Sequence, residues 1–354
     1  MTNAVNIAQS GSNNQTMRNR IINGAMTISQ RNGTSSVTPT DGQYTLDRWV
    51  VETSQASKFT VQQDAGAVTP PTGFVDYLGI TVGASANVTV GSGDYFALEQ
   101  RIEGFNIADL GWGTANAQPV TVSFWVRSSL TGTFGGALGN GGTRSYPFTY
   151  TISSANTWEQ KSVTIAGDTT GTWNTGNGWG IGVFLSIGMG STRLNTANAW
   201  AAGNFLSATG STNLISTNSA TFYITGVQLE EGTAASPFEN RLYGTEFALC
   251  QRYYQINNGF VGTGTTSTIF SGNINFTVTM RSSPTLGQTA ALQITDTYTA
   301  DYTQSVTNIY ITSGVRVTSN SVSFGSNNYT GLTTGRPYLA ISGQTGSVTL
   351  SAEL

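Results

Sequence analysis

The sequence predicts an all-β protein made of an antiparallel β-sandwich, a short linking helix and a smaller C-terminal β domain. Three observations lead to this prediction. The 354 residues include 43 glycines and only 9% charged residues, a composition typical of turn-rich β proteins. Short runs of alternating apolar and polar residues recur along the chain, separated by Gly, Asn and Asp clusters. One segment has helical spacing, and no strand–helix–strand pattern favours a parallel sheet.

The alternation assigns faces to the predicted strands. In QPVTVSFWVRS, Val122, Phe124 and Val126 share one face and are expected in the core. Trp125 and Arg127 share the opposite face. We therefore expect a sheet with one side buried and the other side available for contacts.

Two further runs follow the same rule. In GWGIGVFLSIG, Trp179 has the same parity as Ile181 and Val183, which predicts that its ring belongs to the core. In YFALEQRIEG, Glu99 and Arg101 fall on the face opposite to the large apolar side chains.

The patterns divide the chain into four segments. The first is polar and is expected to be an extended arm that docks on a partner. The helix is expected to start near Thr245, a residue suited to a helix N-cap. The predicted segments are an arm (1–20), a β-sandwich (21–242), a linking helix (243–256) and a β domain (257–354).

Charge and composition exclude several partners. The net charge of −3, with only two lysines, leaves no basic stripe to neutralise phosphates, so nucleic-acid binding is not expected. The first residues lack the apolar core of a signal peptide, and no run of about 20 apolar residues follows, so membrane insertion is not expected. The single cysteine, Cys250, excludes an intrachain disulfide. No cofactor is expected.

The chemistry of the side chains argues against catalysis. The chain contains no histidine, which removes the usual serine and cysteine triads and histidine-containing zinc sites. We expect no catalytic residue and no enzymatic activity. Glu99 and Glu103 leave a polysaccharide depolymerase open as a minor alternative. No metal site is expected, although Gln228, Glu230 and Glu231 leave calcium open beside their ordinary role of tying a loop.

A set of motifs spans residues 19–255: NRIINGAMTISQRNG (19–33), YTLDRW (44–49), QRIEG (100–104), TVSFWVRSS (121–129), YITGVQLEEGTAASPFENR (223–241) and ALCQRYYQ (248–255). In residues, order and spacing, this set resembles bacteriophage tail-fibre and related virion fibre proteins. The C-terminal hundred residues fit the resemblance more loosely.

The resemblance implies a jelly-roll domain similar to carbohydrate-binding modules, followed by a linking helix and a C-terminal β domain. It also implies a homotrimer that is assembled in the host cytoplasm and located in the virion. The arm, residues 1–20, is then expected to dock on other tail or head proteins. The resemblance does not identify the ligand.

Loop tryptophans are the candidate glycan-binding residues. A sugar ring has an apolar face and polar edges, so an exposed aromatic ring beside polar side chains suits it. Trp112 lies between glycines, Trp173 lies beside Asn174, and Trp200 lies among asparagines. The alternative for each ring is that it plugs the end of the sandwich or packs on the next subunit.

Trp125 and Arg127 are a separate candidate because they share the outer face of a predicted strand. That face is expected to be either a glycan groove or a trimer contact, and burial against a neighbouring subunit is the favoured interpretation.

These observations lead to one hypothesis and one principal alternative. The hypothesis is a non-catalytic, homotrimeric tail fibre whose loops bind a host cell-surface glycan weakly and multivalently. The alternative is a head fibre, decoration or connector protein with a purely structural role. Burial of Trp112, Trp173 and Trp200 would favour the alternative.

Overall fold

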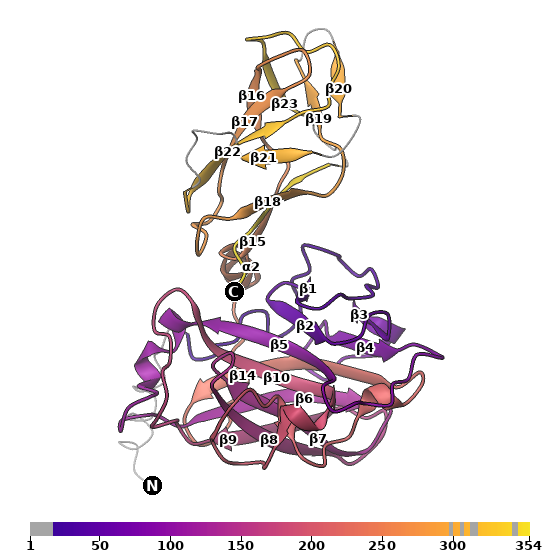
Figure 1. The fold of residues 1–354 in the computed structure, drawn as a ribbon, viewed down its shortest axis with the longest axis vertical. Helices are drawn as coiled ribbons and strands as arrows, with labels where there is room; N and C mark the ends of the chain where they lie inside the picture. Colours follow the sequence, from indigo (N-terminus) through magenta and orange to yellow (C-terminus); the bar gives the residue numbers. More distant parts are fainter. Residues whose placement is uncertain (1–16, 297–299, 305–307, 312–317, 342–345) are drawn as a thin grey trace. The chain divides into compact units, whose positions relative to one another are not determined.

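The computed structural model describes residues 17–296, 300–304, 308–311, 318–341 and 346–354 (Figure 1). The chain divides between Leu242 and Tyr243 into two compact units, and Leu354 groups with the first. Residues 1–16 of the expected arm lie outside the described residues.

The first unit contains a seven-stranded sheet. Every pair of neighbouring strands in this sheet is antiparallel, as the alternating sequence pattern predicted. Its strands, in spatial order, are β1 (Gln43–Leu46), β2 (Trp49–Thr53), β5 (Tyr95–Glu103), β10 (Trp179–Met189), β7 (Gly132–Gly139), β8 (Arg144–Ile152) and β12 (Ala201–Ala202).

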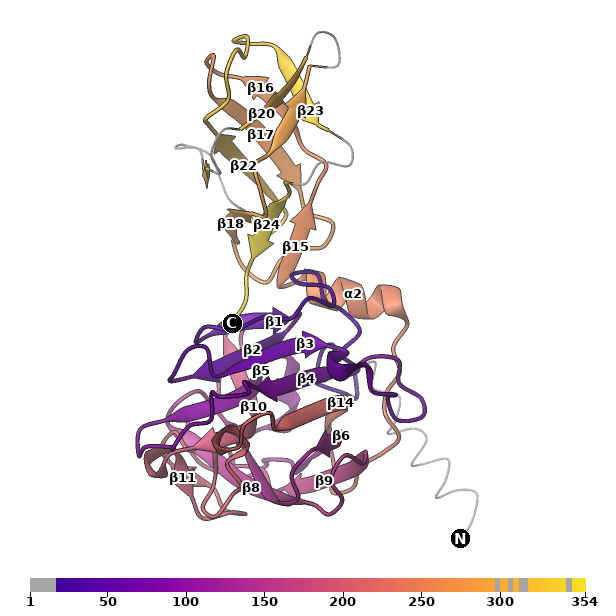
Figure 2. The same ribbon diagram turned by 90° about the vertical axis from the view of Figure 1, so that its right-hand side faces the viewer.

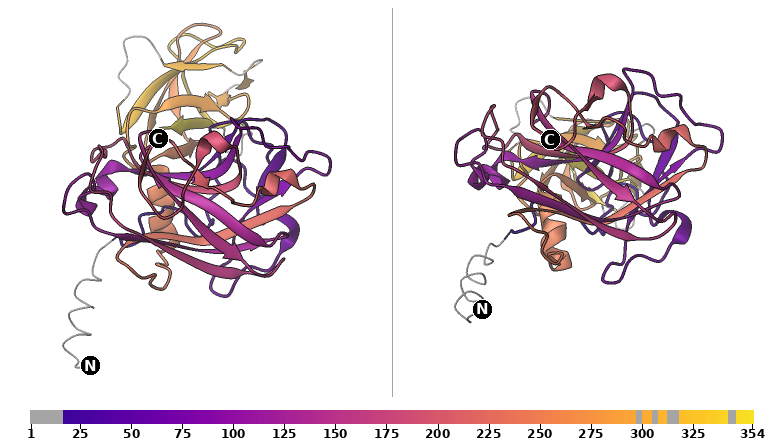
Figure 3. Two further views of the ribbon diagram at one scale, coloured as in Figure 1. Left: turned by 60° about the horizontal axis from the view of Figure 1, so that its bottom comes forward. Right: turned by 90° about the horizontal axis from the view of Figure 1, so that it is seen from below.

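A five-stranded antiparallel sheet forms the second layer (Figures 2 and 3). The chain passes repeatedly between the two sheets, as in a jelly roll: β5 is followed by β6 in the other layer, and β9 by β10. The strands of this second sheet are β3 (Phe59–Gln63), β4 (Leu78–Val82), β14 (Thr221–Glu231), β6 (Val120–Ser128) and β9 (Glu159–Ile165).

The core between the layers follows the predicted alternation on β6. Phe124 and Val126 are buried in the main hydrophobic cluster, while Trp125 and Arg127 on the other face are half-buried. Short connections complete the unit. They are the 3-10 turns η1 (Ala65–Ala67), η2 (Gly104–Asn106), η3 (Ala108–Leu110), η4 (Ser191–Arg193) and η5 (Leu214–Ser216), and a parallel pair of β11 (Leu194–Asn195) with β13 (Ser207–Ala208).

The prediction that Trp179 belongs to the core is wrong. The register between β10 and β5 shifts between Trp179 and Ile181, so that two residues of β10 oppose one residue of β5. This β-bulge at Gly180 reverses the parity of the side chain that precedes it. Trp179 therefore lies with Phe184 on the outer face of the sheet, where it is half-buried.

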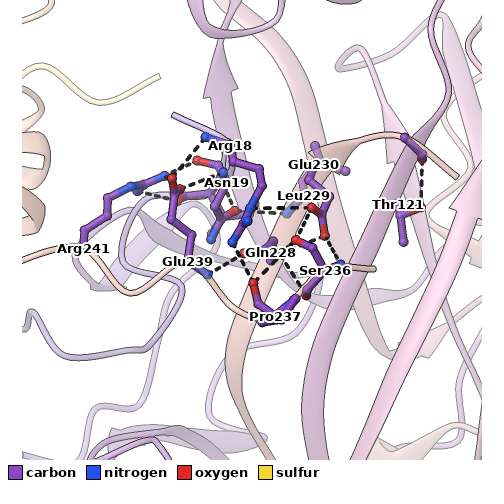
Figure 4. A network of polar contacts seen from close by, with 12 residues as sticks. Arg18, Asn19, Thr121, Gln228, Leu229, Glu230, Ser236, Pro237, Glu239 and Arg241 are labelled. Atoms are coloured by element: carbon purple, nitrogen blue, oxygen red, sulfur yellow. Dashed lines mark hydrogen bonds and ion pairs between the residues drawn. The ribbon is translucent and has the colours of Figure 1, made fainter. Parts of the chain in front are cut away.

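The first described residues also correct the predicted boundary of the arm at residue 20. Asn19 and Arg20 are 1% and 7% exposed, so the segment belongs to the sandwich from this point. The Asn19 amide donates to the carbonyl oxygen of Val227 at 3.1 Å and accepts from the backbone N–H of Leu229 at 3.1 Å (Figure 4). Asn19 thereby satisfies backbone groups at the bulge of β14, where register with β6 is interrupted.

The segment after β14 closes over this junction. Glu239 accepts from the backbone N–H of Asn19 at 2.8 Å and pairs with Arg241 at 3.0 Å (Figure 4). Glu230 accepts from Ser236, and its neighbour Gln228 accepts from the backbone N–H of Glu239 at 2.8 Å. Residues far apart in sequence are thus held together by satisfied buried hydrogen bonds, which fits the predicted loop-tying role of this motif.

The second unit begins with α2 (Tyr243–Gln251), an α-helix that starts before the predicted N-cap, Thr245. The predicted helical segment 243–256 is too long, because Tyr254–Asn257 forms β15. Cys250 is buried and makes no disulfide.

Two sheets follow α2 in the second unit. A separate aromatic core, which includes Phe260, Phe270 and Phe324, lies within this unit. The strands, in spatial order, are β15, β24 (Val348–Ser351) and β18 (Thr285–Gln288) in one sheet, and β20 (Asp301–Thr303), β19 (Gln293–Thr295), β23 (Pro337–Ala340), β16 (Val261–Gly264), β17 (Phe270–Asn275), β22 (Ser321–Ser326) and β21 (Ile309–Ile311) in the other.

Substitution of Asn19 by alanine is expected to destabilise the protein by about 2–3 kcal/mol, because backbone groups of β14 lose their partners in a buried site. Urea unfolding of the variant Asn19→Ala measures this loss. The control Asn116→Ala removes an exposed amide on a loop and is expected to change stability by less than about 0.5 kcal/mol. Equal stability of Asn19→Ala and the unsubstituted protein would contradict the assignment of Asn19 to the sandwich.

Candidate functional site

Three of the predicted binding tryptophans form one closed cluster. The ring centroids of Trp112 and Trp173 are 4.7 Å apart, and Trp200 lies 5.3 Å from Trp112 and 5.4 Å from Trp173, with edge-to-face angles throughout. Tyr146 packs on Trp200 at 5.3 Å. Trp112 and Trp173 are 6% and 7% exposed and belong to the main core, and Trp200 is half-buried against it.

The polar edges of these rings are also occupied. The indole N–H of Trp112 donates to the carbonyl oxygen of Gln118 at 2.8 Å, and that of Trp200 donates to the carbonyl oxygen of Ala166 at 2.7 Å. The Trp173 N–H donates to the carbonyl oxygen of Thr170 at 3.2 Å. With rings and N–H groups both engaged, the tryptophans plug the end of the sandwich, and the prediction that Trp112 and Trp173 are open sugar platforms is wrong.

Asn174 is exposed beside this cluster, but its side chain shapes the loop. Its Oδ1 accepts from the backbone N–H of Gly176 at 2.8 Å. The same loop is braced by a bidentate ion pair in which Arg144 Nε and Nη2 donate to the two oxygens of Asp168 at 2.7 Å each. A buried, bidentate pair of this kind fixes loop geometry.

Trp125 and Arg127 lie on the outer face of the other sheet, apart from the tryptophan cluster. Arg127 Nε donates to the carbonyl oxygen of Asn156 at 2.9 Å, and its guanidinium lies over the ring of Tyr223 at 5.4 Å. Trp125 is half-buried. The predicted residues are therefore distributed over two regions, and together they form no single site.

Replacing Trp173 with alanine is expected to cost about 3–5 kcal/mol of unfolding free energy, because a buried aromatic ring leaves a cavity. Chemical denaturation measures the loss. Trp125→Ala, which removes a half-buried ring from the outer face, is expected to cost less. A Trp173→Ala variant that keeps its stability but loses ligand binding would instead restore the original prediction for this ring.

A different set of residues surrounds a pocket of about 190 Å³ on the outer face of the seven-stranded sheet. Strands β2, β5 and β10 supply its floor, and the β7–β8 hairpin and the segment around β11 and β12 supply its walls. The lining residues are Glu52, Tyr95, Glu99, Arg101, Gly141, Trp179, Phe184, Arg193, Asn204 and Leu206.

An ion triad forms the floor of this pocket. Arg101 Nη2 contacts Glu52 Oε1 at 2.8 Å, and Arg101 Nε contacts Glu99 Oε2 at 3.1 Å. Glu99 is fully buried, and burial raises its pKa to about 8 although Arg101 opposes this shift. Burial also raises the pKa of Glu52. Burial is the main cause of the raised pKa of Glu99, and the neighbouring Glu52 carboxyl raises it further, which favours a proton on this pair near neutral pH.

Trp179 stands over the triad. The Arg101 guanidinium lies 4.4 Å from the centroid of the Trp179 ring, a cation–π arrangement. The backbone of Gly141 also approaches the ring, and a Cβ at this position would lie 3.0 Å from it. The φ of Gly141 is 83°, so a side chain here would also meet backbone strain.

Two buried polar atoms at this pocket lack a hydrogen-bond partner among the described residues. They are Nε1 of Trp179 and Oε1 of Glu99. A buried donor without a partner costs about 1–3 kcal/mol, and such an atom is more common at sites that bind something else. Both residues line the pocket.

Glu99 and Glu103, the carboxylate pair considered from the sequence, are four residues apart on β5, which places their Cα atoms about 13 Å apart at about 3.3 Å per residue. Both residues are buried, and Glu99 is paired with Arg101. In the described part of the chain, no group of three or more His, Cys, Asp or Glu side chains is placed to hold a metal ion.

Sequence reasoning missed this pocket because it depends on a bulge and on contacts between distant strands. Gly180 was the available signal, since a glycine inside an apolar strand often marks a bulge. Nothing in the local sequence around Glu52 indicates that it meets Glu99 on the neighbouring strand. Over the residues that the structure describes, no helix has the length and apolarity required to cross a membrane.

Comparison with known proteins gives resemblance in fold alone. No family model and no curated protein matches the chain. Among solved structures, a CBM61 module in complex with beta-1,4-galactotriose is 11% identical, with a TM-score of 0.30, over 61% of this chain and 99% of the module. A family 11 carbohydrate-binding module from Clostridium thermocellum is 10% identical, with a TM-score of 0.27, over 58% of this chain and 100% of the module.

A viral protein also occurs among the similar structures. The enzymatically active domain of tailspike protein 4 from bacteriophage CBA120 is 12% identical, with a TM-score of 0.32, over 61% of this chain and 22% of that chain. These TM-scores are too low to support an argument about the site, which is therefore described from its own residues.

The buried triad predicts a specific dependence of stability on pH. The pKa of Glu99 is raised to about 8 from an ordinary value of 4.5, so between these values the folded chain holds a proton that the unfolded chain has lost. The free energy of unfolding is therefore expected to fall as pH rises through this window. The stabilisation that comes from the Glu99 proton is fully present only below about pH 4.5.

Urea unfolding at several pH values between 4 and 9 measures this dependence. The variant Glu99→Gln is expected to flatten the curve, because the amide does not titrate. Glu231→Gln, which changes an exposed carboxyl at the end of β14, is the matched control and should follow the unsubstituted protein. Parallel curves for Glu99→Gln and the control would contradict the retained proton.

Proposed function

We propose that this chain binds a cell-surface glycan in the pocket beside Trp179. The observation that carries the proposal is that two residues lining the pocket, Trp179 and Glu99, each hold a buried polar atom, Nε1 and Oε1, without a hydrogen-bond partner among the described residues. A sugar hydroxyl can accept from the indole N–H, and a second hydroxyl can donate to the carboxyl oxygen. The neighbouring rings of Tyr95 and Phe184 supply apolar surface for the C–H groups of a sugar.

The motifs over residues 19–255 support a wider context for this binding. We propose a homotrimeric, non-catalytic fibre that acts in the virion, with glycan binding as its contribution to host attachment. Residues 1–16 are proposed to dock on other virion proteins. A single pocket of about 190 Å³ offers few contacts, and repetition of the pocket in a trimer would raise the effective affinity without further contacts.

The closed tryptophan cluster favours a second candidate function. Trp112 and Trp173 belong to the hydrophobic core. Packing alone therefore accounts for the tryptophans in these loops, without a bound ligand. A head fibre, decoration or connector protein would keep this cluster and would not need the pocket. The absence of histidine from the sequence supports a non-catalytic role in either case.

The substitution Trp179→Phe tests the glycan proposal, because it keeps an aromatic ring and removes the unpaired N–H. Loss of one hydrogen bond worth about 1–1.5 kcal/mol should weaken glycan binding about tenfold. Binding to intact host cells and to a glycan array measures the change. Trp158→Phe is the control, since it removes an indole N–H that donates to Thr69 in the other layer.

Two outcomes would decide against the proposal. One is unchanged binding by a folded Trp179→Phe protein, which would move the site elsewhere. The other is absence of binding to any cell or glycan by the folded, unsubstituted oligomer, which would favour the structural role.

A further inference from the structure

The two arginines of the pocket differ in their partners. Arg101 pairs with Glu52 and Glu99, and its Nη1 donates to the Leu354 carbonyl oxygen at 2.7 Å. Arg193 has no ion pair with a carboxylate in the described part of the chain, and its one side-chain hydrogen bond, from Nη1 to the carbonyl oxygen of Asn204, is 3.5 Å long. A guanidinium normally forms much shorter bonds, about 2.7–2.9 Å, when a carboxylate is available. Arg193 therefore retains most of its capacity to donate.

The fold holds Arg193 at the wall of the pocket. The backbone N–H of Arg193 donates to the carbonyl oxygen of Gly190 at 3.0 Å, and its carbonyl oxygen accepts from the backbone N–H of Leu206 at 2.9 Å. Its guanidinium lies 5.5 Å from the centroid of the Tyr95 ring. When a guanidinium stacks on an aromatic ring, the N–H groups at its edge point away from the ring and can donate to a planar acceptor.

No carboxylate of the pocket lining contacts Arg193. The two lining glutamates, Glu52 and Glu99, both pair with Arg101. Asp41 accepts from the Tyr95 hydroxyl at 3.1 Å and does not line the pocket. A ligand carboxylate at Arg193 would therefore meet a cation that has no ion pair among the described residues.

From these contacts we propose that the pocket is selective for an acidic sugar, whose carboxylate binds the Arg193 guanidinium while a ring hydroxyl accepts from Trp179 Nε1. This inference rests on the proposed glycan binding and specifies its ligand class. A planar carboxylate can accept two parallel N–H groups of one guanidinium, which a neutral hydroxymethyl group in the same place cannot do.

The pair of buried glutamates makes this selectivity dependent on pH. The charged groups that act on Glu99 are Arg101 on its own strand and Glu52 on β2; Trp179, Arg193 and Tyr95 line the same pocket, and Asp41 acts on Glu52. Burial raises the pKa of Tyr95, so its hydroxyl remains neutral in this range. Loss of the retained proton above about pH 8 adds a negative charge to the floor, which repels a bound carboxylate.

The test uses the full-length protein and a panel of oligosaccharides of galacturonate, glucuronate and mannuronate, each with a twin in which the carboxyl groups are reduced to hydroxymethyl groups. Titration calorimetry at pH 6.5 and low salt measures affinity. We expect at least one acidic oligosaccharide to bind about tenfold more tightly than its reduced twin. This preference should disappear in Arg193→Gln, while the affinity for the reduced twin remains.

Arg127→Gln is the matched control, because Arg127 also stacks on a tyrosine but lies on the outer face of the other sheet. It should keep the preference. Raising the pH from 6.5 to 9 should weaken binding of the acidic oligosaccharide in the unsubstituted protein, and much less in Glu99→Gln.

The outcomes separate the two levels of the proposal. Equal binding of every acidic oligosaccharide and its reduced twin would overturn the selectivity and leave glycan binding standing. A preference that survives in Arg193→Gln would overturn the assignment to Arg193. Absence of binding to all acidic and neutral oligosaccharides by the folded protein would overturn both the selectivity and the proposed function.

Discussion

The double ion pair of Arg101 is the interaction on which the proposed site depends. It joins β5 to β2 across the outer face of the seven-stranded sheet, with contacts of 2.8 Å to Glu52 and 3.1 Å to Glu99. Burial raises the pKa of Glu99 to about 8, and its Oε1 lacks a hydrogen-bond partner among the described residues. The same guanidinium lies 4.4 Å from the centroid of the Trp179 ring, whose indole Nε1 lacks a hydrogen-bond partner among the described residues.

Much of the sandwich could be predicted from the sequence because a strand that is buried on one side must alternate. Phe124 and Val126 lie in the core and Trp125 and Arg127 lie outside it, as period-two reasoning requires. The all-β class and the division before the helix follow from the same local pattern. These features depend on residues close in sequence, so the sequence alone carries the information.

The candidate site could not be predicted because it depends on contacts over long distances in sequence. The bulge at Gly180 moves the Trp179 side chain to the other face of the sheet. The local alternation of residues does not show where the register with β5 shifts. Trp112, Trp173 and Trp200 each resemble an exposed loop residue, and only their mutual packing shows that they close the sandwich. The polarity of residues 17–20 predicted an arm, whereas Asn19 supplies hydrogen bonds that β14 requires at its bulge.

The most direct test of the central claim uses the indole N–H groups of the tryptophans as reporters in nuclear magnetic resonance. The Trp179 signal is assigned by its disappearance in Trp179→Phe, and the oligosaccharide panel is then titrated into the unsubstituted protein. The structure predicts that the Trp179 signal moves on binding, while the hydrogen-bonded signals of Trp112, Trp173 and Trp200 stay in place. Movement of the Trp200 signal with an unchanged Trp179 signal would contradict the account and return the binding site to the loops.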